Sequence, residues 1–309
     1  MLRLKQPNFF ISGAPRCGTT ALYSYLSEHP KIFMSQVKEL NYFASDFTNV
    51  QKIAFKSVDD YHKVFAKAGS EHLAVGEASP FYLFSKVAFQ NMFNYDHNAK
   101  VILTLRHPVE FIESYHRLNL SLLREDQPDL GKAWDLQTLR KQGQRIPKSA
   151  RQVELLMYGE LGQFSHYLES LFAIFPRQQV KIFLFDDLKA DPRSVYEKTL
   201  AFIGVPSDNR LEFPQINANF ENKSALLARL FHPPQPVYQV FVKFIALFGT
   251  GFMEKVSIVY NRLERMNTTR ASRTTLDPAL RARMLEHFSP DIKKLSVLIE
   301  RDLSPWLAG

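Results

Sequence analysis

The chain has 309 residues, of which 45% are hydrophobic, and this is enough for a sizeable core in one large domain or two small ones. The 39 Lys and Arg against 31 Asp and Glu give a formal net charge of +8, which suits an anionic ligand, an acidic polymer or a membrane surface. A single cysteine, Cys17, excludes an intramolecular disulfide and a cysteine-based metal cluster.

The apolar stretches of the sequence predict no membrane span. The run Val237–Phe248 is shorter than the roughly 20 residues that a span needs, and Lys243 interrupts it. Seven residues precede the first expected strand, too few for a signal peptide. We therefore expect a cytoplasmic protein.

The stretch 8–30 predicts a strand, a tight loop and a helix. An apolar run at Phe9–Ile11 leads into a loop spaced by glycines, after which Gly18, Thr19 and Thr20 open an amphipathic run. Such a loop directs successive backbone N–H groups and the positive end of the helix dipole to one point. This arrangement suits a phosphate or a sulfate.

Arg16 would add a guanidinium group to this anion site. The spacing from Gly13 to Gly18 matches the phosphate loop of nucleotide hydrolases, but Thr19 stands where that loop has a lysine. A glycine-spaced turn without a ligand is the structural alternative. We interpret Cys17, in the same loop, as a small tolerated residue and not as a redox group.

A second candidate is the segment KELNYF, within Val37–Phe43. Lys38 and Glu39 form an adjacent pair of opposite charges in an apolar and aromatic setting. Charges there are costly unless they are paired, and a carboxylate in such a setting suits a general base. The alternative is a solvated pair on a loop.

A short strand is expected at Leu73–Val75, and it runs into the segment GEASPFYLF. Glu77 and Ser79 would then lie at the carboxyl end of that strand, bracketed by a glycine and a proline. Ligands in open α/β sheets bind outside the carboxyl ends of the strands. A turn with a capping serine is the alternative.

The segment KVILTL, Lys100–Leu105, gives the clearest signal of a buried parallel strand. Arg106 leaves the end of this strand, and Ser114 follows eight residues later on an expected helix. The two side chains would meet on one anion if that helix folds back over the strand.

Residues 124–151 are polar without a clear period, and we interpret them as a mobile surface insertion over the site. A helix is expected at 160–174 and a buried strand at 180–185. Asp186 and Asp187 follow that strand, and we interpret them as helix caps in preference to metal ligands.

The remaining expected elements are helical, apart from an extended piece at 31–34. One predicted helix, 235–248, carries an apolar face with Phe241, Phe244, Ile245 and Phe248, which indicates core packing or, alternatively, contact with an acceptor or a membrane surface. The other helices are expected at 57–66, 85–93, 195–203, 223–230, 252–264, 277–287 and 289–299.

Strands that alternate with helices predict right-handed crossovers and a parallel sheet. We therefore expect an α/β fold with a P-loop-like parallel sheet flanked by helices. The chain would form a single domain, 1–309, in which 1–206 is a nucleotide-binding core and 207–309 a mainly helical C-terminal extension.

Four motifs occur in order along the chain: GAPRCGTT, KELNYF, GEASP, and LRHP with a serine eight residues after its arginine. In this order and spacing they resemble the sulfotransferase family that uses 3′-phosphoadenosine 5′-phosphosulfate (PAPS). The later segments PRQQVKIFLFDDLKADP, FIGVP and HFSPDIKKLSVLIERDLSPW are also similar to that family, especially to its bacterial members. The resemblance covers most of the chain.

The resemblance implies a donor site and a base. The family's 3′-phosphate site falls on Arg106 and Ser114, and the glutamate base of the heparan-sulfate-type members falls on Glu39. Arg16 or Lys38 would stabilise the leaving oxygen without a metal ion. The loop that holds the 5′-phosphosulfate falls on Arg16, Cys17, Gly18, Thr19 and Thr20, and a basic loop over the adenosine on Arg270 and Arg273.

The sequence departs from the family at three positions. The turn GEASP lacks the histidine of the phenol and steroid members, and Ala78 follows Glu77 where heparan-sulfate-type members have a lysine. Arg16 stands where lysine is commoner. These departures favour a glutamate base, with Glu77 as the second candidate after Glu39.

The expected activity is therefore PAPS-dependent sulfuryl transfer, of the EC 2.8.2 type, which leaves 3′-phosphoadenosine 5′-phosphate (PAP). The acceptor would be a hydroxyl group, or as a second choice an amine, of a carbohydrate, a glycolipid or a small metabolite, with Glu77 and Ser79 as substrate contacts. We expect no metal and no nucleic-acid partner, while peripheral membrane contact is compatible with the charge. The sequence indicates neither the acceptor nor the oligomeric state.

Two rival functions remain open at this point. A P-loop nucleotide kinase or NTPase would use the same loop, but it needs a lysine after Gly18 and an aspartate that binds Mg²⁺ after a strand. A non-catalytic anion-binding protein would use the basic surface alone. In that case Glu39 would be dispensable, and salt concentration would govern binding in place of the 3′-phosphate.

Overall fold

The computed structural model describes residues 5–47, 55, 57–150, 152–216, 220–222, 237, 240, 244, 256, 268–270 and 276–308. The chain divides into two compact units. The first comprises Met1–Arg106, Ser170–Ala218 and Phe248–Glu254, and the second comprises His107–Glu169, Asn219–Leu247 and Lys255–Gly309. The predicted single domain, with a nucleotide-binding core at 1–206 and a mainly helical extension at 207–309, stays a prediction.

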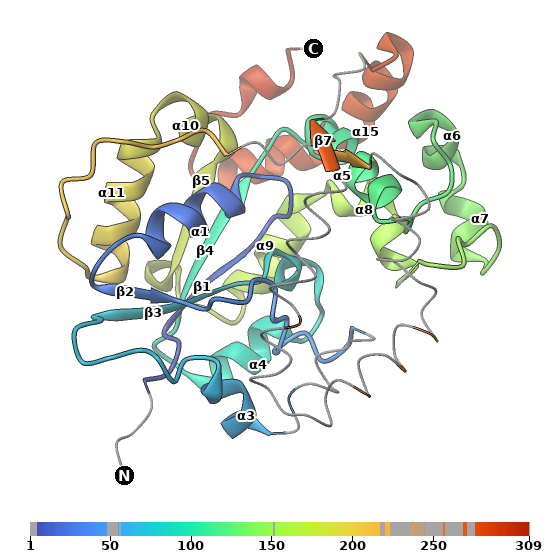
Figure 1. Ribbon diagram of the computed structural model, residues 1–309. Helices are drawn as coiled ribbons and strands as arrows, with labels where there is room; N and C mark the ends of the chain where they lie inside the picture. The colour runs from blue at the N-terminus through green and yellow to red at the C-terminus, as the bar shows by residue number, and fades with distance from the viewer. Residues whose placement is uncertain are drawn as a thin grey trace. The chain divides into compact units, whose positions relative to one another are not determined.

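A parallel sheet of five strands, in the order β2-β3-β1-β4-β5, forms the centre of the first unit (Figure 1). Every neighbouring pair of these strands is parallel, so the predicted α/β fold is confirmed. The strands are β1 Phe9–Gly13, β2 Ile32–Met34, β3 Ala74–Ala78, β4 Lys100–Leu105 and β5 Val180–Leu184.

One face of the sheet packs against α1, Thr19–Ser27, and α11, Pro192–Ile203 (Figure 1). Phe9 and Ile11 of β1 point to this side and join Leu22 of α1 and Leu200 of α11 in one buried cluster. Because side chains alternate along a strand, Phe10 points to the other face. There its ring lies edge-on to the ring of Phe43, with the centroids 5.5 Å apart.

The face below Phe10 carries an aromatic cluster. Tyr61 comes from α3, Val58–Lys63, and Tyr95 ends α4, Ala88–Tyr95. Tyr82 belongs to the 3-10 helix Pro80–Phe84 that follows β3. The rings of all three lie within about 6 Å of the Phe43 ring, at 5.5, 5.2 and 5.9 Å for Tyr61, Tyr95 and Tyr82.

Polar caps fix the helix ends of the first unit. Asp191 accepts a hydrogen bond from the backbone N–H of Ser194 and starts α11, which ends at Gly204 with a φ of 79°. Asp187 lies in α10, Phe185–Ala190, and accepts from the N–H of Leu184 at 3.2 Å. The interpretation of the aspartate pair as a cap is therefore confirmed at Asp187.

The second unit is mainly helical in its described part. Its short strands β6, Phe220–Asn222, and β7, Thr268–Arg270, pair antiparallel. The helix α9, Phe164–Phe172, belongs to this unit as far as Glu169. The other helices are α5 Pro108–Ser121, α6 Leu130–Asp135, α7 Gln137–Lys141, α8 Tyr158–Leu161 and α15 Pro278–Leu298, with 3-10 turns at Glu154–Leu156 and Ser304–Trp306; a further 3-10 turn, Arg177–Gln179, belongs to the first unit.

The prediction of a mobile surface insertion at 124–151 is wrong. The segment contains α6 and α7, and a salt bridge buried between Glu125 and Arg140 anchors it. Two charged groups with no exposed side-chain surface persist only as a hydrogen-bonded pair, so they join the start of the segment to α7, and Tyr158 of α8 donates to the same carboxylate from outside the segment. The polar composition of the segment does not indicate this pair.

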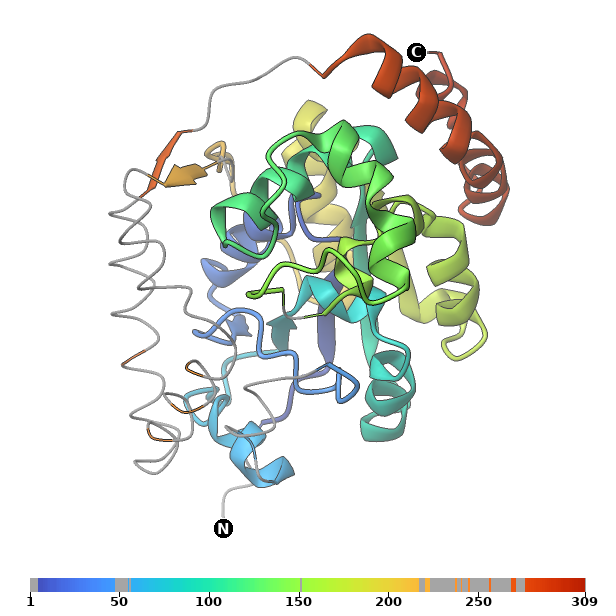
Figure 2. The same cartoon turned by 90° about the vertical axis from the view of Figure 1, so that its right-hand side faces the viewer.

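Two helix boundaries also differ from the prediction. The helix expected at 160–174 is divided into α8 and α9 at Gly162, where an added Cβ would lie 2.4 Å from the Phe288 ring. The two helices expected at 277–299 are one, α15, the red helix in Figure 2, with Pro290 inside it. Its buried residues recur every three or four positions and keep one face packed: Leu280, Met284, Phe288, Ile292 and Leu295.

The helices predicted at 223–230, 235–248 and 252–264 lie outside the described residues, except for single positions. Phe244, one of these positions, is helical and 58% exposed. Among the described residues, no helix is long and apolar enough to cross a membrane.

Candidate functional site

Four loops leave the carboxyl ends of the parallel strands at one edge of the sheet. The chain runs from β1 across β3 to β2, whereas it runs from β4 outward to β5 on the other side. The order of the strands therefore reverses between β1 and β4, and such a switch point is where open α/β sheets bind ligands. The loop after β1 and Arg106 after β4 flank this point.

The loop after β1 has the backbone of an anion site. Arg16 and Gly18 have positive φ values, 66° and 91°, and Gly18 caps the N-terminus of α1. A Cβ on Gly18 would lie 2.5 Å from Leu188 of α10, so only glycine fits here. Thr19 and Thr20 open the helix, and the first N–H groups of a helix have no partner within it.

The positive charges of two guanidinium groups lie close to this loop. Burial raises the pKa of the Cys17 thiol to about 12, while the positive charges of Arg106 and Arg16 and a backbone hydrogen bond from Arg106 oppose the rise. Arg106 also stacks on the ring of Phe185, 4.9 Å from its centroid. The structure thus brings Arg16 and Arg106 to the same loop. Cys17 itself is fully buried, and a thiol with this pKa is not a nucleophile at neutral pH.

Lys38 connects the second motif with the phosphate-sized loop. Its Nζ donates a hydrogen bond to Thr20 Oγ1 at 2.8 Å and lies 5.5 Å from the ring centroid of Tyr23, also on α1. The next residue, Glu39, is exposed, has a φ of 62°, and donates its backbone N–H to Ala78 O at 2.9 Å. The segment therefore lies between α1 and the end of β3.

Glu77 lies inside β3, which extends to Ala78, so the strand predicted to end at Val75 is longer than expected. The reason is close packing, because Gly76 leaves room for the ring of Phe9 where a Cβ would come within 2.2 Å. Glu77 and Ser79 have no exposed surface. Their prediction as substrate contacts stays a prediction.

The Glu77 carboxylate accepts hydrogen bonds from three hydroxyl groups. Ser79 and Tyr82 donate to Oε1 at 2.6 and 2.7 Å, and Tyr61 donates to Oε2. Burial raises the pKa of Glu77, and the hydrogen bonds from Ser79, Tyr61 and Tyr82 oppose that rise. Sequence reasoning missed both tyrosines. Tyr82 follows Glu77 closely in the chain, which is a weak signal, whereas nothing near Tyr61 in the sequence indicates the contact.

The predicted 3′-phosphate pair is divided between the two units. Arg106 is the last residue of its segment in the first unit, and Ser114 is buried in α5 of the second unit. Their joint anion site stays a prediction. Arg270 ends β7, where its backbone is paired with that of Phe220, and Arg273 lies outside the described residues.

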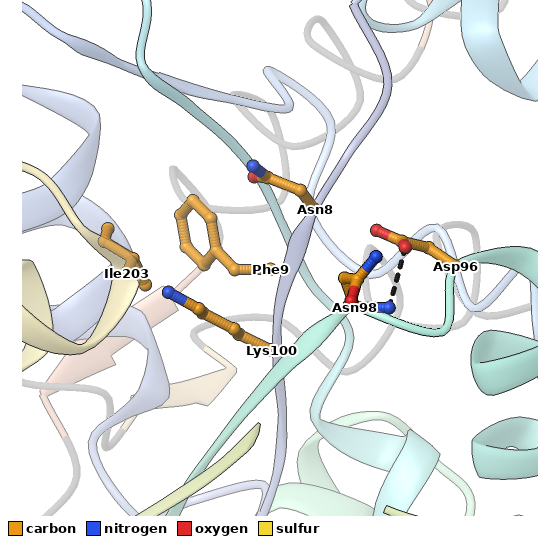
Figure 3. Close-up of a pocket in the computed structure, with 6 residues that line it drawn as sticks. All are labelled: Asn8, Phe9, Asp96, Asn98, Lys100 and Ile203. Atoms are coloured by element: carbon orange, nitrogen blue, oxygen red, sulfur yellow. Dashed lines mark hydrogen bonds between the residues drawn. The ribbon is translucent and has the colours of Figure 1, made fainter. Parts of the chain in front are cut away.

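A cavity of about 220 Å³ lies at the opposite edge of the sheet, near the start of β1 and β4 (Figure 3). Asp96 accepts a hydrogen bond from the backbone N–H of Asn98 beside it, at 2.9 Å. Lys100 Nζ, drawn at the left beside Ile203, donates to Phe202 O. The lining residues include none of the predicted site residues: Asn8, Phe9, Asp96, Asn98, Lys100 and Ile203.

Comparison with known proteins shows the family to which the chain belongs. Residues 6–229 match the family model for a sulfotransferase domain. The chain belongs to the sulfotransferase family. The matched residues include the loop after β1, KELNYF, GEASP and Arg106, so the predicted resemblance is confirmed.

Relatives of this sulfotransferase include two curated proteins. It is 34% identical over 123 residues to the membrane-associated sulfotransferase kil1 of Dictyostelium discoideum, which is 39% of this chain and 25% of the relative. It is 25% identical over 202 residues to the human bifunctional heparan sulfate N-deacetylase/N-sulfotransferase 3, which is 64% of this chain and 22% of the relative. The matched stretches thus span about a quarter of these longer proteins.

A solved structure is similar over the whole chain. The crystal structure of a sulfotransferase from Alicyclobacillus acidocaldarius matches with a TM-score of 0.69 and 26% identity. The match covers 98% of this chain and 99% of that one. The sulfotransferase fold therefore extends beyond residue 229.

Proposed function

We propose that this sulfotransferase moves a sulfuryl group from PAPS to a hydroxyl group of its acceptor, with Glu39 as the base. The hydrogen bond from Lys38 Nζ to Thr20 Oγ1, at 2.8 Å, carries the proposal. It ties the segment with the candidate base to the first turn of α1, where the anion loop ends. A cation and a carboxylate in adjacent positions are thereby held at the loop that would bind the transferred group.

The residues at the switch point fit the anionic ends of the donor. The first turn of α1 offers backbone N–H groups, and the two threonine hydroxyls that open it are further donors to a 5′-phosphosulfate. When bound, PAPS supplies the activated sulfuryl group. Arg16 and Lys38 stabilise negative charge on the leaving phosphate oxygen, so this mechanism assigns no step to a metal ion.

Arg106 is the cation that we assign to the 3′-phosphate. It follows β4, and the loop with Arg16 follows the neighbouring strand β1, so two phosphate groups at the switch point would have a cation from each strand end. Ser114 is the proposed second ligand of the 3′-phosphate, and Arg270 and Arg273 are the proposed cover of the adenosine. The 3′-phosphate is what separates this donor from ATP.

Exposure separates the two candidate bases. Glu39 is exposed and lies beside the end of β3, whereas Glu77 is fully buried and accepts three hydroxyl donors. A general base must come within hydrogen-bonding distance of the acceptor's hydroxyl group, directly or through one water molecule. Glu39 meets this requirement with less rearrangement, and we assign the proton transfer to it.

The proposed acceptor is a hydroxyl group of a carbohydrate, a glycolipid or another small metabolite. The human relative is named for heparan sulfate N-sulfotransfer, which supports a carbohydrate and keeps an amine as the second choice. The Dictyostelium relative is named membrane-associated, which supports peripheral membrane contact or a lipid-linked acceptor. Cytoplasmic location stays a prediction.

Calorimetric titration with PAP, against AMP and against ATP with Mg²⁺, tests the donor. We expect metal-independent binding of PAP and binding of AMP that is weaker by about 30-fold or more, because AMP lacks the 3′-phosphate and its charge-assisted contacts. Preference for ATP with Mg²⁺ would instead support a nucleotide kinase or NTPase. Binding of any polyanion according to salt concentration alone would support a non-catalytic anion-binding protein.

A further inference from the structure

The buried carboxylate of Glu77 has no role in the proposed reaction, although it lies directly beside the segment with the base. It lies in β3, between β2 and β1, with no exposed surface, and it is hydrogen-bonded to Ser79, Tyr82 and Tyr61. A buried carboxylate is costly unless donors surround it. Three donors gathered from two segments of the chain therefore indicate an arrangement with a purpose beyond core packing.

Each of these hydroxyl-bearing residues also contacts the segment that follows Glu39. Ser79 Oγ accepts a hydrogen bond from the backbone N–H of Asn41 at 2.9 Å. Tyr82 Oη accepts from the backbone N–H of Phe43 at 3.3 Å. The Tyr61 ring stacks on the ring of Tyr42, with the centroids 4.1 Å apart and the planes at 8°. The three residues Asn41, Tyr42 and Phe43 are thus each held by one partner of Glu77.

The direction of the hydrogen bonds depends on the negative charge of Glu77. A hydroxyl group has one hydrogen and two lone pairs. A carboxylate only accepts, so it draws the hydrogens of Ser79 and Tyr82 toward itself and leaves their lone pairs facing the backbone N–H groups. A glutamine at this position would present an amide donor to part of the cluster. Its single oxygen could still accept from Ser79 and Tyr82, which share Oε1, but as a neutral and therefore weaker acceptor, while the hydroxyl of Tyr61 would have to turn.

Two residues at the start of this segment, Glu39 and Asn41, have backbone conformations that are unfavourable unless other contacts fix them. Glu39 and Asn41 have φ values of 62° and 49°, in a region that non-glycine residues seldom occupy. Such conformations persist where the surrounding contacts fix them, and they gather at functional sites. The contacts at Asn41, Tyr42 and Phe43 lie directly after Glu39, and the N–H of Glu39 bonds to Ala78, the neighbour of Glu77.

We propose that Glu77 is a positioning residue, which holds the segment Asn41–Phe43, and through it the base Glu39, by way of Ser79, Tyr82 and Tyr61. The inference rests on the proposed function for its consequence in catalysis. The structural part of the inference, the anchoring of the segment, is a property of the fold and is independent of the proposed function. Glu77 thereby takes no part in proton transfer itself.

Amide hydrogen exchange, followed residue by residue by NMR, tests the anchoring without any assay of activity. In Glu77→Gln we expect the amides of Asn41 and Phe43 to exchange about tenfold faster or more, because a neutral amide oxygen holds their acceptors, the hydroxyls of Ser79 and Tyr82, less firmly than a carboxylate does. The amide of Ala14, which donates to Thr104 O at 2.8 Å in the loop after β1, should not change. Tyr95→Phe is the matched control.

Tyr95 suits this purpose because it belongs to the same aromatic cluster, while its hydroxyl pairs with His62 at 2.9 Å. Removal of this hydroxyl should leave the exchange at Asn41 and Phe43 unchanged. Equal exchange in Glu77→Gln and Tyr95→Phe would overturn the proposal.

Two further variants keep the test decisive if Glu77→Gln does not fold. Ser79→Ala should accelerate exchange at Asn41 and leave Phe43 as it is, because only the acceptor of Asn41 is removed. Tyr82→Phe should do the reverse. Uniform acceleration in both variants, or none in either, would show that the segment is not held through these hydroxyls.

Kinetics of sulfuryl transfer then separates positioning from chemistry. We expect Glu77→Gln to lower kcat by about 100-fold, as for a misplaced catalytic group, with the KM for PAPS unchanged. The acid limb of the pH profile of kcat should remain, because the base is still Glu39. Loss of that limb would make Glu77 the base and overturn the proposal. If the parent transfers no sulfuryl group, the proposed function fails, while the exchange result still decides the anchoring.

Discussion

Replacing Arg140 by methionine removes one half of the buried ion pair in the second unit. The guanidinium donates from Nη1 to Glu125 Oε2 at 2.7 Å and from Nη2 to Glu125 Oε1 at 2.6 Å, and neither side chain has exposed surface. Methionine is apolar and of similar volume, so it fills most of the space without replacing the charge. The variant therefore leaves Glu125 as an unpaired buried carboxylate.

The structure sets the size of the effect. Removal of one partner of a buried pair costs about 3 to 5 kcal/mol. Glu125 keeps the hydroxyl of Tyr158 at 2.8 Å and the backbone N–H groups of Asp126 and Gln127 at 3.0 Å. Because these donors still solvate part of the charge, we expect the lower end of the range, about 3 kcal/mol.

Denaturant unfolding, followed by far-UV circular dichroism, measures this loss. Arg117→Met is the matched control, because Arg117 pairs with Glu113 along the same unit with side chains that are 21% and 23% exposed. A solvent-accessible pair of this spacing contributes about 0.5 kcal/mol or less. The double variant Glu125→Leu/Arg140→Met removes both charges, and we expect it to recover most of the loss. A loss of 0.5 kcal/mol or less for Arg140→Met, equal to the control, would refute the reasoning.

The pH dependence gives an independent check on the same pair. Burial alone would raise the pKa of Glu125, but hydrogen bonds from Arg140, Gln127 and Tyr158 outweigh it and lower the pKa. A lowered folded-state pKa contributes stability above the unfolded pKa of the carboxyl, and this stability is lost as the pH falls through the folded value. The deficit of Arg140→Met should therefore be largest near neutral pH and shrink in acid. A deficit that does not vary with pH would show that Glu125 is not the charge left unpaired.

Three further variants or treatments address the site. Glu39→Gln should keep PAP affinity in calorimetry while turnover falls by about 100-fold or more, and unchanged turnover would move the base elsewhere. Arg106→Ala should weaken PAP binding by about 2 to 3 kcal/mol, with a much smaller change in the free energy of unfolding, and equal affinity would remove Arg106 from the donor site. Cys17, buried and with its thiol pKa raised by that burial to about 12, should resist iodoacetamide in the native protein and react rapidly in guanidinium chloride; fast labelling without denaturant would show that the loop opens.

The sheet was predictable where strands are buried on both faces. The strand predicted at Lys100–Leu105 has these bounds in β4, because a central parallel strand requires a continuous apolar run. The predicted strand ends at Val75, and the glycine and the glutamate that follow it are uncommon in strands. Gly76 nevertheless belongs to the strand, since the ring of Phe9 packs where its side chain would be. Phe9 belongs to another strand, so the sequence around Gly76 does not indicate this contact.

The helical part shows the same limit. The helix predicted at 277–287 was ended before Pro290, but α15 continues through it to Leu298. A proline removes one backbone hydrogen bond, whereas Phe288 and Ile292 on either side of it are buried. The packing of the whole face outweighs the local break. In the same way, the pairing of Glu125 with Arg140 depends on side chains 15 residues apart, which polar composition does not reveal.

The candidate site was predictable to the extent that it follows strand ends. Arg16, Glu39 and Arg106 come after three different strands, and parallel pairing brings those ends to one edge. The chemistry of Glu77 was not predictable in this way. In sequence it is one more titratable residue in a motif, and its nearest equivalent, Glu39, differs from it only in its surroundings.

Those surroundings decide what each glutamate is able to do. Glu39 is exposed next to the anion loop, so a proton can pass to it from an acceptor, while Glu77 is enclosed by hydroxyl groups that already use its oxygens. Tyr61, which completes the enclosure, lies 16 residues before Glu77 and reaches it from α3. A carboxylate that is fully engaged in this way acts through the positions of its partners. In the proposed mechanism the two glutamates are therefore complementary: Glu39 meets the acceptor, and Glu77 fixes the position of the segment that carries Glu39.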